Sequence, residues 1–259
     1  MTTPYRVGLI VPSSNVTMET ELPALLARHA VAAGRGVTFH SSRAVLHQVH
    51  AEALSRMVAE SERCAHELAD ARVDVVAYAC LIAVMAEGQG AHEAAETRLA
   101  TTLAAAGSPV PVTSSAGALV RALKRLGAKR VAIVTPYLKP LTALVGRYLA
   151  DYGIEVVDSL SLEVPDNIEV GRLDPAKLTA YAKSLDLTHA DAVVLSACVQ
   201  MPSLAAIDQA GQVLGLPVLS AATATASEIL ALLGEVPVIS GAGAALASAA
   251  AGTRRSNGE

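Results

Sequence analysis

The stretch VDVVAYACLIAVM, from Val73 to Met85, decides the fold expected for this chain. Its first seven residues predict a strand buried on both faces, because apolar and β-branched residues run together over the length of a strand. That strand leads directly into Cys80. A second stretch, ADAVVLSACVQM (190–201), repeats the pattern and brings Cys198 to the matching position. The chain has only three cysteines, so this repeat predicts two similar halves with one cysteine after an equivalent strand in each.

Three further pairs of segments repeat in the same order along the chain. They are RVGLIVPSSN (6–15) with KRVAIVTPY (129–137), VTFHSSRAVL (37–46) with IEVVDSLSLEV (154–164), and GSPVPVTSS (107–115) with GLPVLSAAT (215–223). Helical patterns lie between these segments, at about 17–33, 51–71, 92–106, 141–152 and from near Pro175. The Ala- and Gly-rich segment after Val236 is also expected to be helical. Strands that alternate with helices predict an α/β fold with parallel sheets.

The fold class expected is therefore two similar four-stranded, doubly wound, flavodoxin-like halves related by pseudo-two-fold symmetry. In a sheet of order 2-1-3-4, ligands bind at the carboxyl ends of strands 1 and 3, where the strand order reverses. Strand 1 of the first half ends near Pro12, Ser14 and Asn15, and strand 3 ends at Cys80. The corresponding exits in the second half are at Tyr137 and Cys198. If the halves face each other, these side chains line one cleft, which is the expected active site.

Domain boundaries follow from the repeat. We expect residues 1–116 and about 224–250 to form the N-terminal half, residues 117–223 the C-terminal half, and residues 251–259 a disordered tail. The last helix is then expected to return to the first half, which would make that half discontinuous.

Composition narrows the function classes. Apolar residues make up 52% of the chain and charged residues 17%, with a net charge of −4. No basic stripe is present, which argues against nucleic acid as a partner. No apolar run reaches the length of a membrane span, and the N-terminus does not resemble a signal peptide.

The cysteines and histidines predict neither a disulfide framework nor a metal site. An odd, sparse set of three cysteines favours the reducing cytoplasm as the location. There is no Cys-x-x-Cys pair, and the seven histidines form no HExxH grouping. We therefore expect no metal and no cofactor.

Five motifs resemble the maleate cis–trans isomerase branch of the aspartate/glutamate racemase superfamily, which is related to the arylmalonate decarboxylases. They are GLIVPSSNVTMETELP (8–23), YACLIAVM (78–85), VTPYLKPL (134–141), PDNIEVGRLD (165–174) and LSACVQMPSL (195–204). The resemblance extends over nearly the whole chain, to about Glu235. It implies a homodimer that converts the dicarboxylate maleate to fumarate through a covalent succinyl-cysteine type intermediate.

Carried onto matching positions, the resemblance implies that Cys80 is the nucleophile and Cys198 its acid/base partner. Asn15, Tyr137 and Asn167 would bind the substrate carboxylates by hydrogen bonds. Further substrate-binding positions are expected at Ser14, Pro12, Leu81, Ile82 and Val199. Many superfamily members have Thr or Asn after the first cysteine, so Leu81 and Ile82 argue against an amino-acid racemase.

Other interpretations remain open at this point. An amino-acid racemase or an arylmalonate-type decarboxylase would share the fold, and so would a two-lobed dicarboxylate-binding protein. A thiolate nucleophile needs a lowered pKa, which helix N-termini and backbone N–H groups would supply. Cys64 is expected to be a buried apolar side chain, and Asn15 to cap the next helix. Glu19 and Glu21 are expected on that helix, either on a solvated face or as charges in its first turn.

Overall fold

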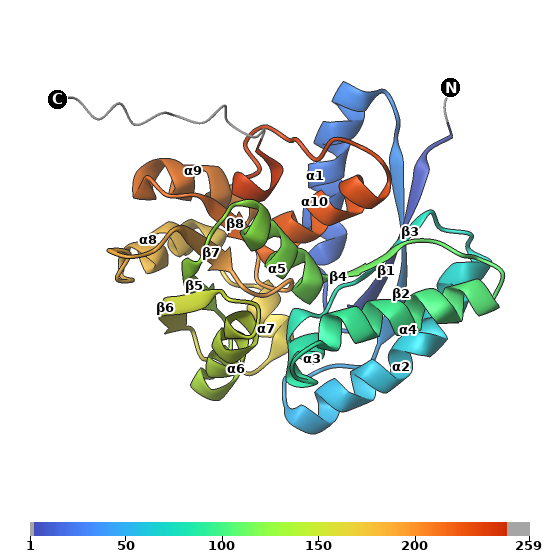
Figure 1. The fold of residues 1–259 in the computed structure, drawn as a ribbon, viewed down its shortest axis with the longest axis horizontal. Coiled ribbons are helices and arrows are strands. Elements are labelled where there is room, and N and C mark those ends of the chain that lie inside the picture. Colours follow the sequence, from blue (N-terminus) through green and yellow to red (C-terminus); the bar gives the residue numbers. More distant parts are fainter. Residues whose placement is uncertain (1–2, 248–259) are drawn as a thin grey trace.

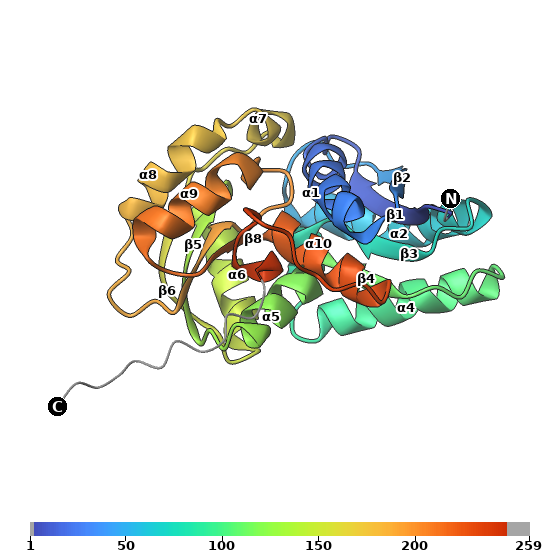
Figure 2. The same ribbon diagram turned by 90° about the horizontal axis from the view of Figure 1, so that it is seen from above.

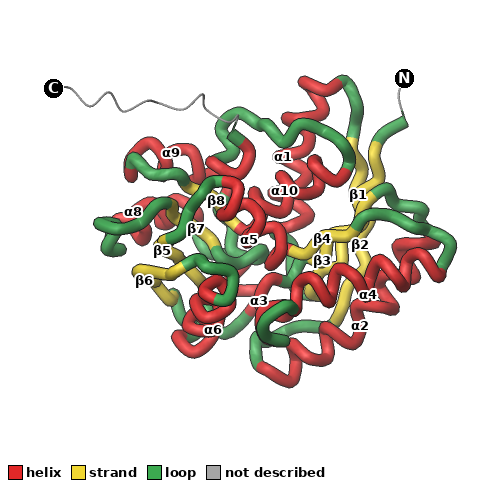
Figure 3. The backbone as a smooth tube through the Cα atoms, in the orientation of Figure 1, coloured by secondary structure: helices red, strands yellow, loops and turns green. Residues whose placement is uncertain are grey.

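The structure is a computed structural model that describes residues 3–247. It contains two four-stranded parallel sheets (Figures 1 and 3). The first sheet has the order β2-β1-β3-β4 and the second β6-β5-β7-β8, which confirms the predicted fold class and strand order. The strands are β1 (Tyr5–Pro12), β2 (Val37–Ala44), β3 (Val75–Tyr78), β4 (Val112–Ser114), β5 (Arg130–Thr135), β6 (Glu155–Ser161), β7 (Ala192–Ser196) and β8 (Val218–Ser220).

Helices connect the strands and cover the sheets. In chain order they are α1 (Met18–Ala33), α2 (Ala51–Asp70), α3 (Leu81–Ala86), α4 (Ala91–Ala105), α5 (Ser115–Arg125), α6 (Lys139–Ala150), α7 (Asn167–Gly171), α8 (Leu178–Lys183), α9 (Leu204–Leu214) and α10 (Ala221–Leu232). Two 3₁₀ turns, Pro175–Lys177 and Ala244–Leu246, complete the described elements.

Strand β3 and strand β7, each an inner strand of its sheet, are apolar along almost their whole length, because helices cover both faces of each sheet. Every residue of β3 (VVAY) and of β7 (AVVLS) is buried. Close packing also explains Gly8 in the middle of β1. A Cβ atom there would lie 3.2 Å from the side chains of Leu68 in α2 and Val76 in β3, so a larger residue would push α2 and β3 away.

Helix α10 lies between the two halves, against α5, and Figure 2 shows the pair between the two sheets. It also contacts helix α1 and the strands β3 and β4 of the first sheet. In the chain it follows directly from β8 of the second sheet. Glu228 of α10 pairs with Arg121 at 2.7 Å and with Arg125 at 2.9 Å, both on α5. Glu228 is only 8% exposed, so these two cations compensate a largely desolvated charge.

Two local features differ from the expectations. The segment after Val236 forms no helix up to Gly243, and Pro237 together with two glycines at positive φ, Gly241 and Gly243, explains the interruption. The apolar residues after Cys80 form the short helix α3, which the sequence did not predict. Residues 251–259, expected to be a disordered tail, lie outside the described residues.

Candidate active site between the two sheets

The carboxyl ends of β1, β3, β5 and β7 meet around one small cavity. Its lining residues are Pro12, Asn15, Leu46, Val49, Cys80, Leu81, Ile82, Tyr137, Asn167, Cys198, Val199 and Gln200. All of the expected site residues except Ser14 are among them. The cavity has a volume of about 10 Å³, near the room needed by a single water. The described conformation is therefore closed, and a dicarboxylate needs a wider cavity than this one.

Cys80 lies at the junction of β3 and α3, where it is the residue that precedes the first turn of the helix. Its side chain is almost completely buried. The pKa of the Cys80 thiol is raised to about 12, chiefly by burial and to a smaller extent by the neighbouring Cys198, while the backbone N–H of Ala83 acts in the opposite direction. The expectation that the site lowers this pKa was therefore wrong for the closed cavity, because desolvation outweighs a single donor.

Cys198 follows β7 and is held by more hydrogen-bond donors than Cys80. Burial raises the pKa of its thiol, but the Tyr137 hydroxyl and the backbone N–H groups of Gln200 and Met201 act in the opposite direction. The Gln200 N–H donates to Cys198 Sγ at 3.3 Å. Because donors stabilise the charged form, Cys198 is better able than Cys80 to hold a negative charge.

Asn15 connects the two halves with its side-chain amide. Its Oδ1 accepts a hydrogen bond from the backbone N–H of Met18 at 3.0 Å, so Asn15 does cap the start of α1. Its Nδ2 donates to the backbone carbonyl of Val199 at 3.3 Å, in the segment that follows Cys198. Asn15 is completely buried, and both ends of its amide are used in the closed conformation.

Asn167 is the first residue of α7 and is 5% exposed. Its Nδ2 donates to Ser14 Oγ at 2.7 Å, and Ser14 Oγ in turn donates to the carbonyl of Leu46. Ser14, although outside the cavity lining, thus orients the Asn167 amide. The backbone N–H of Asn167 donates to the His47 carbonyl at 3.3 Å, which joins α7 to the segment after β2.

Two residues near the site, Gln200 and Arg43, have roles that the sequence did not reveal. Gln200 lines the cavity, although nothing in its sequence position beyond its proximity to Cys198 marked it. Arg43 donates to the carbonyls of Ser13 and Asn15 at 3.0 and 2.9 Å and pairs with Glu19. Because Glu19 balances the guanidinium charge, Arg43 holds the exit of β1 without supplying an uncompensated cation.

Glu21 lies in the first turn of α1, one of the two places expected for it, but it is not on a solvated face. Its side chain is buried, and its Oε1 accepts hydrogen bonds from the backbone N–H groups of Ser203 at 2.5 Å and Leu204 at 2.6 Å. It therefore caps the N-terminus of α9 in the other half. Burial raises the pKa of the Glu21 carboxyl, while these backbone donors lower it.

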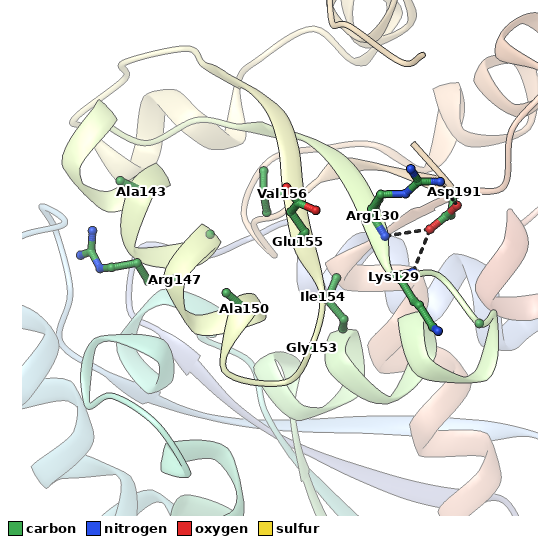
Figure 4. A pocket seen from close by; sticks show the side chains of 12 residues that line it. Lys129, Arg130, Ala143, Arg147, Ala150, Gly153, Ile154, Glu155, Val156 and Asp191 are labelled. Atoms are coloured by element: carbon green, nitrogen blue, oxygen red, sulfur yellow. Dashed lines mark hydrogen bonds and ion pairs between the residues drawn. The ribbon is translucent and has the colours of Figure 1, made fainter. Parts of the chain in front are cut away.

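A wider hollow lies at the opposite, amino-terminal edge of the second sheet, between β5, β6 and α6 (Figure 4). Its polar groups largely satisfy one another: Asp191 accepts from the backbone N–H groups of Lys129 at 3.0 Å and Arg130 at 2.8 Å. No cysteine lines it. The cavity at the carboxyl ends is therefore the candidate active site, as expected for a doubly wound sheet.

Within residues 3–247, no group of three or more His, Cys, Asp and Glu side chains is arranged to hold a metal ion. Among the helices of this described part, none is long and apolar enough to cross a membrane. All three cysteines are free thiols, and Cys64 is buried in α2, as expected for an apolar core position.

Two cysteine thiols lie at equivalent strand exits, one in each half, and neutral amide and hydroxyl groups line the cavity beside them. This arrangement defines a cysteine-based enzyme with two doubly wound α/β halves. The family model for arylmalonate decarboxylase matches residues 7–246. The chain is similar in sequence to two maleate isomerases. The one from Geobacillus stearothermophilus is 55% identical over 93% of this chain and 97% of the relative. The one from Pseudomonas putida is 53% identical over 96% of this chain and 100% of the relative. The chain belongs to the maleate isomerase family, within the group that the arylmalonate decarboxylase model describes.

Solved structures agree with this assignment. A maleate isomerase from Pseudomonas putida S16, crystallised with maleate as a cysteine-to-alanine variant, superimposes with a TM-score of 0.94 at 47% identity over 95% of this chain and 99% of that one. The second structure is a cysteine-to-serine variant of a Nocardia farcinica maleate cis–trans isomerase with a covalently bound succinylcysteine intermediate. It superimposes with a TM-score of 0.90 at 50% identity, over 93% of this chain and 98% of that one. Arylmalonate decarboxylase, at 22% identity and a TM-score of 0.77, shares the fold.

Proposed function

We propose that this chain catalyses the cis–trans isomerisation of maleate to fumarate, without a cofactor, through a succinyl-cysteine intermediate. One observation carries the proposal: the two cysteines that follow the equivalent strands β3 and β7 line the same cavity. Maleate and succinylcysteine in the structures of relatives, at about half-identical sequence, support the substrate and the covalent step.

The reaction requires the C2=C3 double bond of maleate to become single for a time, and thiolate addition achieves this. In our proposal the Cys198 thiolate takes the proton from Cys80, and the Cys80 sulfur then adds to C2. The electron pair of the double bond moves to C3, which receives the proton from Cys198. Rotation about the C2–C3 single bond follows. Cys198 then removes the proton from C3, the C2–S bond breaks, and fumarate leaves. Transfer of that proton from Cys198 to the released Cys80 thiolate restores the starting state.

The difference between the two thiol environments supports this division of roles. Cys198 receives hydrogen bonds from Tyr137 and two backbone N–H groups, so a negative charge is better stabilised on Cys198 than on Cys80 whenever Cys198 has given up its proton. Cys80 has one such donor, the Ala83 N–H. A less stabilised thiolate is a stronger nucleophile once formed, which suits the residue that attacks carbon.

Neutral donors suit a dianionic substrate in this site. We propose that Asn15, Tyr137 and Asn167 bind the two carboxylates, with Pro12, Leu81, Ile82 and Val199 shaping the cavity and Ser14 orienting Asn167. Hydrogen bonds to the charged carboxylates supply binding energy. Since no uncompensated cation is fixed there, the electron pair that develops at C3 is not held too strongly for the elimination step.

We also propose that the protein acts in the cytoplasm as a homodimer, and that residues 1–116 with about 224–250 form one half and residues 117–223 the other. Three free thiols are in keeping with a reducing compartment. The packing of α10 on α1, β3 and β4 supports a discontinuous first half.

A direct assay tests the proposed activity. Loss of maleate and appearance of fumarate are followed with the purified chain in the absence of added cofactor, beside the variants Cys80→Ser and Cys198→Ser. We expect conversion by the wild type and loss of at least about 100-fold in each variant. If both variants convert maleate at the wild-type rate, or if the wild type does not convert it, the proposed function is wrong.

A further inference from the structure

Gln200 follows Cys198 by two residues and is only 2% exposed. The Oε1 atom of its side chain accepts hydrogen bonds from the backbone N–H groups of Val16 at 3.1 Å and Thr17 at 3.4 Å. These two residues connect the exit of β1 to α1 in the first half. The side chain therefore reaches from the second half into the turn that carries Asn15.

The Nε2 atom of the same amide donates in two further directions. It bonds to the carbonyl of Ser14 at 3.0 Å and to the carbonyl of Asn167 at 2.9 Å. A carboxamide has two acceptor and two donor positions, so all four positions of Gln200 are used. One neutral side chain thus binds the backbone on both sides of Asn15 and the backbone of Asn167 itself.

The backbone of Gln200 connects this arrangement to the second cysteine. Its N–H donates to Cys198 Sγ at 3.3 Å, and its carbonyl accepts from Thr17 Oγ1 at 2.7 Å. A displacement of the Gln200 side chain therefore also displaces a donor to the thiol. Gly171 leaves the space that the amide occupies, because a Cβ atom there would lie 2.6 Å from Gln200 Nε2.

We propose that Gln200 is a positioning residue, which holds the two substrate-binding carboxamides and the Cys198 thiol in one fixed arrangement across the two halves. This role rests on the proposed isomerase activity and adds a residue that does not itself carry the chemistry. Its effect on catalysis is exerted through Asn15, Asn167 and Cys198. A shift of about 1 Å in such groups costs on the order of 100-fold in rate.

Two substitutions test this role. Gln200→Met keeps the length of the side chain and removes all four hydrogen bonds, and Gln200→Glu replaces the two N–H donors with a carboxyl group. Gln212→Glu is the matched control, because Gln212 lies on the exposed side of α9 and bonds to Asp208. The measurements are kcat and KM for maleate, and the Kd of succinate, a saturated dicarboxylate, by calorimetry.

For Gln200→Met we expect kcat/KM to fall about 100-fold. KM and the succinate Kd should each rise about tenfold or more, because hydrogen bonds to the carboxylates are misaligned. A merely structural residue would lower the amount of folded enzyme, and so the apparent kcat, without changing KM or Kd. The Gln212→Glu control is expected to match the wild type in all three quantities.

The Gln200→Glu variant adds a pH signature. When protonated, the introduced carboxyl donates one hydrogen bond to the carbonyl of Ser14 or Asn167, and when ionised it donates none. The ratio of its kcat/KM to that of the wild type should therefore rise as the pH is lowered. This measurement remains decisive if Gln200→Met fails to fold.

Wild-type KM and wild-type succinate Kd in folded Gln200→Met would overturn the positioning role, and so would a pH-independent ratio for Gln200→Glu. Failure of the proposed function is distinguishable from this result. A wild type that binds succinate but does not convert maleate would disprove the isomerase activity, while the Kd values would still decide whether Gln200 positions the binding groups.

Discussion

The Tyr137 hydroxyl forms a hydrogen bond to the Cys198 thiol, and this contact links the exit of β5 to the exit of β7. The bond lowers the pKa of Cys198 against the opposing effect of burial. Burial and the neighbouring thiols raise the pKa of Tyr137 well above its ordinary value, so the hydroxyl keeps its proton and remains a donor. In the closed cavity the pair therefore stabilises a charge on sulfur, and when substrate is bound the single O–H proton donates either to the thiolate or to a carboxylate.

Tyr137→Phe removes that donor and should raise the pKa of Cys198. The rate depends on a thiolate, so the pH profile of kcat should move to higher pH, and kcat at neutral pH should fall on the order of 10- to 100-fold. Rate measurements across pH 6 to about 10 check this. An unchanged profile in the variant would contradict the role given to Tyr137.

Asn167→Ala should raise KM for maleate about tenfold or more, because a donor to a charged carboxylate is lost. Asp166→Ala is the matched control on the same helix. Asp166 caps α7 by accepting from the N–H groups of Ile168 at 2.8 Å and Glu169 at 3.3 Å. Its loss should cost about 1 kcal/mol of stability with little change in KM. Equal changes in KM for the two variants would argue against substrate binding by Asn167.

Glu21→Ala should destabilise the protein by about 1–3 kcal/mol, because the N–H groups of Ser203 and Leu204 lose their acceptor in a buried place. Glu21→Gln should cost less, since an amide oxygen still accepts and burial already disfavours the charged carboxyl. Denaturant unfolding of both variants at neutral pH measures the difference. A larger loss in Glu21→Gln than in Glu21→Ala would contradict the capping role.

Stability should fall at alkaline pH. The pKa of Cys80 is about 12 in the folded protein and about 9 in the unfolded chain. The neutral thiol is favoured by folding, so its contribution is complete below pH 9 and is lost as the pH rises towards 12. The maximum effect is about 4 kcal/mol. The serine of Cys80→Ser does not ionise in this range, so the free energy of unfolding of the variant should depend less on pH between pH 9 and 12. An unaltered slope in the variant would contradict the raised pKa of Cys80.

Much of the fold, including the two sheets and their strand order, was predictable from the sequence, since local sequence patterns determine it. The strands β3 and β7 are apolar up to the last residue of each, and the order of strands in a doubly wound sheet brings their exits together with those of β1 and β5. Helix α3 was missed because the run LIAVM, buried along its whole length, has no amphipathic period.

The contacts between the halves were not predictable in the same way. Gln200 and Glu21 bond to backbone groups more than 180 positions away in the chain. Backbone N–H and carbonyl groups are common to nearly every residue, so no residue type marks such a partner. The raised pKa of Cys80 also depends on how completely the halves enclose it, which composition does not reveal.

The central claim is that Cys80 attacks the substrate while Cys198 moves the proton. The most direct measurement is peptide mass spectrometry of Cys198→Ser after incubation with maleate. We expect one succinyl adduct, on the peptide that contains Cys80, and none on Cys64. The absence of an adduct at Cys80 under all conditions, or an adduct at Cys198 in the Cys80→Ser variant with normal turnover, would contradict the account.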